Sequence, residues 1–416
     1  MSVYDPDTFT EGLISELSLF DLPPTQTSVS DVFYEEIRPL SQVTGDSPIE
    51  FKISGQNSMD YLDLKGSQLY VKLKVLKADG TAIAKGKVGP ANLFLQSLFS
   101  TTEVTLQNKA TITRNFNPYR AMIQTFLHYG EDAINTQLTT QGFTLDDADS
   151  PSVASPGGTN SGLYDRAKLI EDSKVVSLQG PVCNELFSMN RYLLNSTDVK
   201  LKLYRTQNSF CLLSEEAGGS YKVEILDMYL LAKKVKVNAA VLIAHNHMLK
   251  SSNAKYPFTR QECRVQSIAQ GSTSFHWDNM FQGQKPTKLV IGFVKAKAVS
   301  GTYGTNPFYF ENCGITNIGL YADGLPVGGS PLKLDFDTTK GADTMKAYTK
   351  LLINAGKWQE DAGTLLDRDR FIAGSTLFVF QLEPEFAHHG NYLSLVKTGQ
   401  VRLDVQFKTG LSGKFK

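Results

Sequence analysis

Apolar and polar residues alternate in short runs along most of the chain. The runs at residues 49–53, 69–75, 199–203 and 401–405 each carry an apolar side chain at every second position. A period of two is typical of β-strands that bury one face, and turns containing Gly, Pro or Asn separate the runs. The pattern therefore predicts a chain built mainly of short strands.

Two stretches change to the spacing of a helix. In the first, Asn117 and Pro118 fit a helix start, and apolar residues recur at positions 119, 122, 123, 126 and 127 before Gly130. In the second, Asp343 is the expected cap, and apolar residues follow at 345, 348, 351 and 352 before Gly356. Both are expected to be short helices inserted between strands.

A third helix is predicted at residues 238–254, near the middle of the chain. Asn238 fits the N-cap, and Lys250 suits the C-terminal end of the helix dipole. The segments on both sides of this helix consist mostly of strand patterns. We therefore interpret it as a bridge between two β domains.

The segments before and after the bridge share the same order of elements. Residues 70–75 match 289–295 with an offset close to 220, whereas 199–203 match 401–405 with an offset of 202. The offset falls where the first copy holds the Gly- and Pro-rich loop at 146–162, as a surface insertion requires. The sequence thus indicates an internal duplication.

This duplication predicts an all-β fold of two tandem jelly rolls of the eight-stranded type, with short inserted helices. The expected parts are an N-terminal arm at residues 1–44, a first jelly roll at 45–237, the bridging helix at 238–254 and a second jelly roll at 255–416. The length of 416 residues suits two domains of roughly 200 residues each.

The second copy differs from the first at its end. Nine residues come after Phe407, and none of them matches the long strand expected at residues 221–237. We therefore expect the second jelly roll to lack its last strand and to leave an open edge with which another chain could pair.

Charge, cysteine spacing and the distribution of apolar residues indicate the kind of partner, the state of the thiols and the cellular compartment. Lys plus Arg and Asp plus Glu each total 42, so the chain has no strong uniform field for holding nucleic acid, and protein partners are expected. The cysteines at 183, 211, 263 and 313 are widely spaced, which favours reduced core thiols over disulfides or zinc ligands. We find no signal-peptide pattern and no apolar run near ~20 residues, so we expect synthesis inside the cell and no membrane span.

The residue patterns do not point to catalysis, a cofactor or a metal. Motifs of nucleotide-binding proteins, serine hydrolases and zinc proteases are lacking. His245 and His247 are two residues apart on a predicted helix and so face different directions. Asp146, Asp147 and Asp149 could touch calcium, but they lack the EF-hand spacing, and a solvated loop is the preferred interpretation.

Large apolar side chains outside the strand pattern are candidate contacts between subunits. The arm carries an apolar stripe that ends at residues 23–24, and this stripe either folds back on its own domain or reaches a neighbouring subunit. The aromatic candidates could instead serve core packing. The candidates are Leu13, Leu17, Phe20, Phe275, Trp277 and Trp358.

Nine short motifs spread over nearly the whole chain point to a family. They are Ser15–Thr27, Asp60–Leu64, Val88–Asn92, Ser97–Ser100, Lys255–Phe258, Asn279–Gln284, Lys288–Gly292, Asn306–Phe308 and Leu320–Gly324. In this order they resemble the double jelly-roll, hexon-like major capsid proteins of Polinton or Maverick elements and adintoviruses. Members of that family usually continue past the position of Lys416 with another strand, so the chain departs from the family pattern there.

The resemblance implies a structural protein. Two jelly rolls per chain and three chains per homotrimer give six similar wedges, and such pseudo-hexameric capsomers tile an icosahedral shell around double-stranded DNA. It further implies contacts between neighbouring capsomers, a single jelly-roll penton protein as a partner, and a place in the virion capsid. The balanced charge fits a wall better than a protein that binds specific DNA sequences.

Two other classes of function stay open. Tandem jelly rolls also occur in hydrolases that cleave glycans or amides, and glycan cleavage needs two carboxylates about 5–9.5 Å apart in a cleft. A lectin-like binder would instead carry an aromatic-lined groove at one end of the strands.

Overall fold

A computed structural model describes most of the chain. The described residues are 12–20, 22–43, 45, 47–55, 59–149, 151, 160–216, 218–281, 283–339, 341–383 and 392–416. Strands predominate and the helices are short, which confirms the prediction of a mainly β protein. The first eleven residues of the expected arm and most of the Gly- and Pro-rich loop lie outside the described residues.

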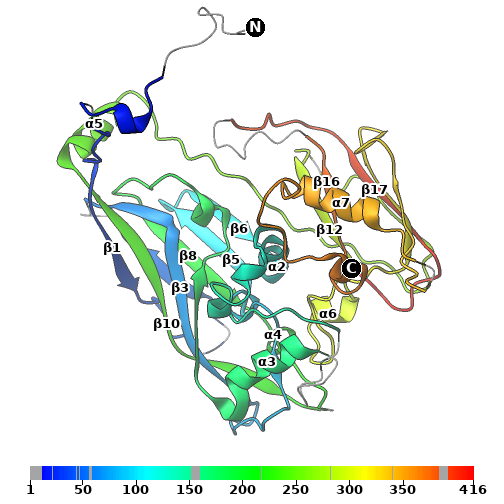
Figure 1. The fold of residues 1–416 in the computed structure, drawn as a ribbon. Coiled ribbons are helices and arrows are strands. Elements are labelled where there is room, and N and C mark those ends of the chain that lie inside the picture. Colours follow the sequence, from blue (N-terminus) through cyan, green and yellow to red (C-terminus); the bar gives the residue numbers. More distant parts are fainter. Residues whose placement is uncertain are drawn as a thin grey trace, which may run out of the picture.

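The first half contains two four-stranded antiparallel sheets (Figure 1). One sheet has the order β1 (Val29–Ile37), β10 (Tyr221–Val237), β3 (Tyr61–Lys77), β7 (Val176–Pro181). The other has the order β2 (Ile49–Ile53), β8 (Val199–Arg205), β5 (Phe99–Leu106), β6 (Ala110–Arg114). A two-residue pair, β4 (Gly89–Pro90) with β9 (Leu212–Leu213), lies beside them.

The alternation of apolar and polar side chains along the strands explains why these two sheets pack face to face. Val71, Leu73 and Val75 on β3 are fully buried, and so are Leu201 and Leu203 on β8 from the other sheet. All five belong to one apolar cluster, so the inward faces of both sheets form a common core. The strands pair in an order that interleaves distant parts of the sequence, as in a jelly roll.

The N-terminal arm expected at residues 1–44 includes a strand, β1, that belongs to the first sheet. Residues 29–37 fall within its range of 1–44, yet β1 pairs with β10 over its whole length, from Val29–Val237 to Ile37–Leu230. Most of its side chains are exposed, because β1 is an outer strand with little cover. Its apolar alternation is therefore weak, which is why the pattern did not reveal the strand.

The second half holds a larger and a smaller sheet. The larger has the order β11 (Ser274–Trp277), β17 (Val401–Phe407), β13 (Ile315–Ala322), β14 (Leu325–Pro326), with β15 (Leu332–Lys333) also paired to β13. The smaller is β12 (Lys288–Gly292) with β16 (Leu377–Gln381). Three helices accompany them: α6 (Ala296–Ser300), α7 (Met345–Asn354) and α8 (Arg368–Ile372).

The predicted helices are present. The bridge is α5 (Ala239–Leu249), in which the Asn238 side chain accepts a hydrogen bond from the Ala240 N–H as an N-cap. The helix with Pro118 in its first turn is α2 (Asn117–His128). For α7, Thr344 rather than Asp343 occupies the cap position, and no side chain caps the helix.

Some helices were not predicted. Asn160 caps α3 (Ser161–Ile170), which comes after the Gly- and Pro-rich loop, and Asp367 caps α8. The remaining short elements are α1 (Phe94–Ser97), α4 (Asn208–Cys211), η1 (Ser15–Leu17), η2 (Glu131–Ala133), η3 (Thr139–Gln141), η4 (Glu171–Ser173) and η5 (Glu185–Ser188).

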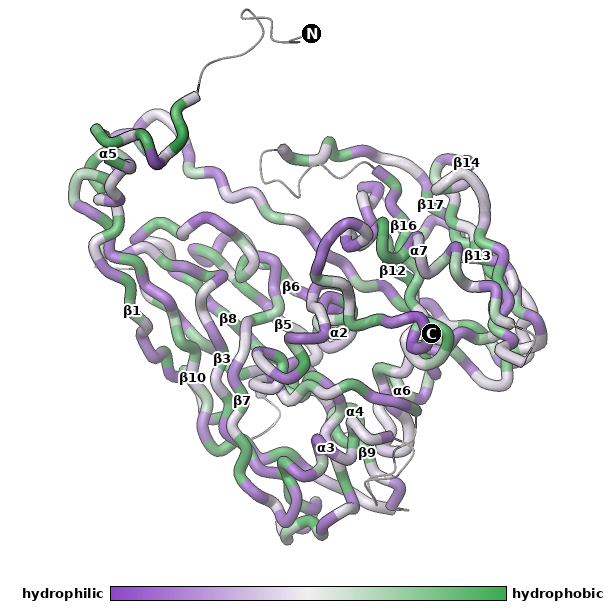
Figure 2. The backbone as a smooth tube through the Cα atoms, viewed as in Figure 1, coloured by the Kyte–Doolittle hydropathy of each residue, from purple (hydrophilic) through white to green (hydrophobic). Residues whose placement is uncertain are grey.

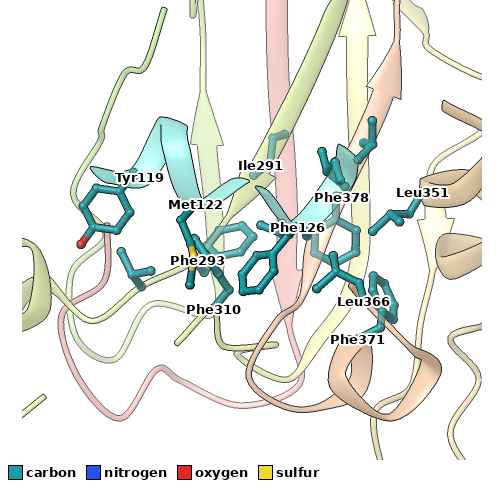
Figure 3. Packing of buried hydrophobic residues seen from close by; sticks show 14 of the residues in the cluster. Tyr119, Met122, Phe126, Ile291, Phe293, Phe310, Leu351, Leu366, Phe371 and Phe378 are labelled. Atoms are coloured by element: carbon teal, nitrogen blue, oxygen red, sulfur yellow. The ribbon is translucent and has the colours of Figure 1, made fainter. Parts of the chain in front are cut away.

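Helix α2 joins the two halves. Its buried residues Tyr119, Ala121, Met122, Phe126 and Leu127 belong to the same apolar cluster as the core of the second half. Phe126 packs edge-to-face on Phe310 with ring centroids 6.4 Å apart, and Tyr119 packs on Phe308 at 5.8 Å. Figure 3 shows Met122 and Phe126 from α2 among the second-half residues Phe293 and Phe310. A helix inserted in the first half thus completes the core of the second.

Candidate assembly surfaces

The acidic loop links the two halves instead of being free in solvent. Asp146 forms an ion pair of 2.7 Å with Arg166, whose side chain is fully buried, and accepts a hydrogen bond of 2.9 Å from Asn306 in the second half. Asp149 pairs with Lys295 of the second half at 2.5 Å. The carboxylates therefore serve the junction, and the prediction of a solvated loop is wrong for these two residues.

Lys295 is held by two carboxylates. Besides Asp149, it lies 2.9 Å from Glu311. Burial lowers the pKa of the Lys295 ammonium, but the hydrogen bonds to Asp149 and Glu311 outweigh this and raise the pKa above its ordinary value. The ammonium therefore stays charged at every physiological pH.

A second polar cluster lies at the same junction. The buried Glu185 carboxylate pairs with Arg114 and accepts a hydrogen bond of 2.8 Å from the Gln261 N–H. Arg120, also buried, donates to the Gln261 side chain at 3.2 Å and lies 3.9 Å from Glu185. Because Gln261 belongs to the segment that leads into the second half, this cluster ties that segment to the first half.

The four cysteines are free thiols, of which Cys211 is buried and the other three are partly buried. Burial raises the pKa of Cys211 to about 12 and that of Cys263 to about 11, and it also raises the pKa of Cys183 and Cys313. Thiols with raised pKa values are weak nucleophiles and poor metal ligands at neutral pH. Within the described part of the chain, no cluster of three or more His, Cys, Asp or Glu side chains could hold a metal ion.

A cavity of about 500 Å³ lies between the end of β8 and the start of β10, with Tyr303 of the second half in its wall. Its described lining is polar and includes Arg205, Lys222 and Asn208, but it contains no carboxylate. The paired carboxylates that glycan cleavage requires are thus not found among the described residues of this cavity.

The strongest apolar exposure lies at one corner of the molecule. In the part of the arm before β1, Leu13 and Leu17 are exposed and Phe20 is 97% exposed, so these apolar side chains are not covered by their own domain. Beside them, eight of the eleven residues of α5 are apolar, yet the helix buries none of its residues, and Ile243 and Met248 are exposed. Figure 2 shows hydrophobic stretches in both segments at this corner.

Backbone contacts fix the arm to this corner. The Asn238 N–H at the start of α5 donates to the Ser28 carbonyl at 2.9 Å. We call the exposed set Leu13, Leu17, Phe20, Ile243 and Met248 the apolar corner. Sequence reasoning missed the α5 members, although a helix that is apolar on all sides normally requires cover on more than one side.

The aromatic candidates fall into two groups. Phe275 and Trp277 lie on β11, a strand that pairs only with β17 among the described residues. Both are half-buried against the second-half core, with ring centroids 6.5 Å apart, so they pack within their own chain. Trp358, in contrast, is 56% exposed. The structure does not bring these residues together with the apolar corner.

The amino-acid sequence was compared with family models and with known proteins. No family model matches the chain. An uncharacterized protein of Caenorhabditis elegans, F54H12.2, is 25% identical over 406 residues, which span 93% of this chain and 92% of the relative. This relative has no described function to compare.

Solved structures are more informative. The Sputnik virophage structure matches with a TM-score of 0.61 and 12% identity, over 98% of this chain and 89% of that chain. The PBCV-1 virus capsid matches at 0.55 and 10% identity, over 94% and 87%. The mavirus major capsid protein matches at 0.51 and 11% identity, over 98% and 91%.

The chain is a mostly β protein whose fold is similar to that of these double jelly-roll capsid proteins. The structural match covers almost the whole of this chain and most of each matched chain. It therefore includes both halves of this protein and the junction between them. At 10–12% identity it establishes the fold alone. No helix among the described residues has the length and apolar character needed to cross a bilayer.

Proposed function

We propose that this protein is the major capsid protein of a virus or virus-like element. The main support is that solved capsid structures share the fold of this protein across both halves, with up to 98% of this chain covered. The motif resemblance adds a more specific proposal, that the element is of the Polinton, Maverick or adintovirus type. The role is structural and not enzymatic.

The proposed assembly unit is a homotrimer. Three chains of two similar jelly rolls present six wedges, so each capsomer has a pseudo-hexameric outline and tiles an icosahedral shell around double-stranded DNA. The balanced charge of 42 basic and 42 acidic residues suits a wall that meets neighbouring capsomers more than a surface that binds specific DNA sequences. A single jelly-roll penton protein is the proposed partner at the vertices.

The apolar corner is the proposed main contact between subunits. Its arm residues Leu13, Leu17 and Phe20 are exposed in the isolated chain, and leaving such a patch in water is unfavourable by roughly 25 cal/mol per Å². Trp358 is a second proposed contact, because a tryptophan exposed over half its surface is a typical interface anchor. Phe275 and Trp277, half-buried in their own chain, are proposed for the rim of a contact only.

The other two classes of function lose support. The cavity of about 500 Å³ beside β8 and β10 contains no carboxylate, and its wall is polar with two tyrosine rings, unlike a hydrolase cleft or a sugar-binding groove. The proposed localisation rests on the capsid role: the protein is incorporated into the virion capsid.

Molecular mass in solution tests the proposal. Light scattering coupled to gel filtration should give about 138 kDa, three times the 45.9-kDa chain, and negative-stain images should show threefold particles with hexagonal outlines. The double variant Leu17→Asp, Phe20→Asp should reduce the mass to that of one chain with unchanged circular dichroism, because both side chains are exposed in the isolated chain. A wild-type protein that stays monomeric at tens of micromolar contradicts the trimer.

A further inference from the structure

The outer side of α7 carries both apolar and basic side chains. On its inner side, Ala347 and Leu351 are buried in the core of the second half. Lys346 and Ile353 are seven residues apart, so they lie together on the side that points away from this core. Lys346 is exposed, and Ile353 is 50% exposed. A helix whose apolar residues served only its own core would not place an isoleucine there.

Other side chains extend this surface. Met345 at the start of α7 and Trp358 just after its end are both exposed. The Lys350 ammonium donates to the Gly328 carbonyl at 3.1 Å, which places the loop between β14 and β15 beside the helix. We call the following set the α7 face: Met345, Lys346, Lys350, Ile353, Lys357 and Trp358.

The α7 face is basic and contains no carboxylate. Residues 344–359 include three lysines and no acidic residue. Burial lowers the pKa of the Lys350 ammonium, and the ammonium of Lys346, one helical turn away, lowers it further. Like charges four residues apart on a helix repel each other. A carboxylate from another source would relieve this repulsion.

The N-terminal arm has the complementary chemistry. Residues 1–22 include five acidic residues and no basic residue. Two of these, Glu16 and Asp21, lie in sequence within the apolar stripe of the arm. Leu17 and Phe20 of the same stripe are exposed. An acidic segment with exposed apolar side chains matches a basic surface with exposed apolar side chains, because each supplies what the other lacks.

The arm and the α7 face lie at different places on the molecule. Figure 1 shows η1 of the arm beside α5 at the first half, whereas α7 belongs to the second half. The hydrogen bond from the Asn238 N–H to the Ser28 carbonyl holds the base of the arm at α5. The described arm residues therefore do not reach the α7 face of their own chain. Complementary surfaces at two different places on a chain join copies head to tail, and such contacts generate a closed ring when the rotation between copies permits it.

We propose that the arm of one copy of this chain binds the α7 face of the next copy. The apolar arm residues cover Ile353 and Trp358, and the arm carboxylates meet the lysines of the face. This inference rests on the proposed homotrimer and names its contact: each subunit gives one arm and receives another, so the contact occurs once for each pair of neighbours. The apolar residues supply most of the affinity, and the charges select the partner and speed the encounter.

Charge reversal on each side tests the contact. The arm variant Glu16→Lys, Asp21→Lys and the face variant Lys346→Glu, Lys357→Glu should each raise the dissociation constant of the trimer by about tenfold or more, because like charges then meet. The variant with all four changes restores opposite charges and should return to within about threefold of the wild type. Sedimentation velocity measures the assembly. Lys350 stays unchanged because it bonds to Gly328.

A matched control reverses two lysines outside the face. Lys297→Glu, Lys333→Glu changes the net charge by the same amount at two exposed positions and should leave the dissociation constant as in the wild type. If this control weakens the trimer as much as the face variant does, net charge sets the association and the proposed contact is wrong. A four-change variant that assembles no better than either two-change variant contradicts it as well. Melting midpoints recorded for every variant show whether the fold is kept.

Mixing two deficient variants distinguishes this contact from an arm-to-arm contact. Leu17→Asp, Phe20→Asp keeps the α7 face, and Ile353→Asp, Trp358→Asp keeps the arm. Each should be a monomer alone, and the mixture should give a pair of about 92 kDa, twice the 45.9-kDa chain, because only one intact arm can meet one intact face. A face variant that still forms trimers overturns this inference and leaves the proposed trimer standing. A wild-type chain that stays monomeric refutes both.

Discussion

The two halves of the chain differ most at one strand position. In the first half, β3 lies between β10 and β7, and its inward residues Val71 and Leu73 are completely buried. In the second half, β12 has one described partner, β16, and its residues Leu289 and Val290 are only half-buried. A strand with neighbours on both sides contributes two rows of hydrogen bonds and a covered core face, and a strand with one neighbour contributes half of this.

The difference between β3 and β12 suggests a general lesson: two halves with a similar order of elements need not be equally stable. The second half compensates by borrowing α2 from the first, so that its core continues into the inserted helix. Polar contacts at the junction add to this: Asp146 of the first half accepts a hydrogen bond from Asn306 of the second, and Asp149 forms an ion pair with Lys295. We therefore expect perturbations at the junction to affect the second half more than the first.

Removal of a junction aromatic should have the largest effect. Phe126→Ala leaves a cavity between the halves and should lower the free energy of unfolding by about 3–5 kcal/mol. Urea unfolding followed by tryptophan fluorescence, which reports the second half, should shift more than unfolding followed by circular dichroism. The matched variant Leu73→Ala, in the first-half core, should shift the circular dichroism and leave the fluorescence transition less affected. Equal shifts for both probes in both variants would show that the halves unfold as one unit.

Loss of the buried ion pair should come next. Asp146→Ala leaves the fully buried Arg166 without its carboxylate, at a cost of about 3 kcal/mol. Asp146→Asn, which keeps a hydrogen-bond acceptor, should cost less. The comparison is made by chemical denaturation at pH 7. An Asp146→Ala variant as stable as the wild type would mean that Arg166 finds another partner.

Removing the asparagine N-cap should destabilise a helix that is packed in the core more than a helix that is exposed. Asn160→Ala removes the cap of α3, whose residues Leu163 and Ile170 are buried, and should cost about 1–2 kcal/mol of global stability. Asn238→Ala removes the cap of α5, which buries none of its residues, and should change the free energy of unfolding by under about 0.5 kcal/mol. In the proposed trimer α5 is expected to be covered, so Asn238→Ala should weaken assembly more than it weakens folding. Sedimentation velocity and thermal melting measured side by side distinguish the two effects.

The pH dependence at Lys295 should be the smallest effect. Because its pKa is raised in the folded chain, Lys295 stabilises the fold fully below the unfolded lysine value of about 10.4 and loses this contribution as the pH rises above it. The side chain is 42% exposed, so the contribution should stay below about 1 kcal/mol. The stability difference between wild type and Lys295→Met should be constant from pH 7 to 9 and shrink above pH 10. A difference that grows with pH would reverse the assignment.

The sequence by itself determined the class of fold, and it predicted an internal duplication. Strand alternation at 49–53 or 199–203 and the helix pattern of α2 are local signals, because period and capping depend on neighbouring residues alone. The exposed arm candidates Leu13, Leu17 and Phe20 were also found this way, since a stripe of apolar residues outside any strand is visible without a structure.

Only the tertiary structure decided how the halves meet. The pairing of β1 with β10 joins residues about 200 positions apart, and the weak alternation of an outer strand gave no sign of it. The roles of Asp146 and Asp149 depend on Arg166, Asn306 and Lys295, which come from other elements and from the other half. The place of Phe415 between Ile268 and Lys295 likewise arises from backbone hydrogen bonding over long range, which no run of side chains encodes.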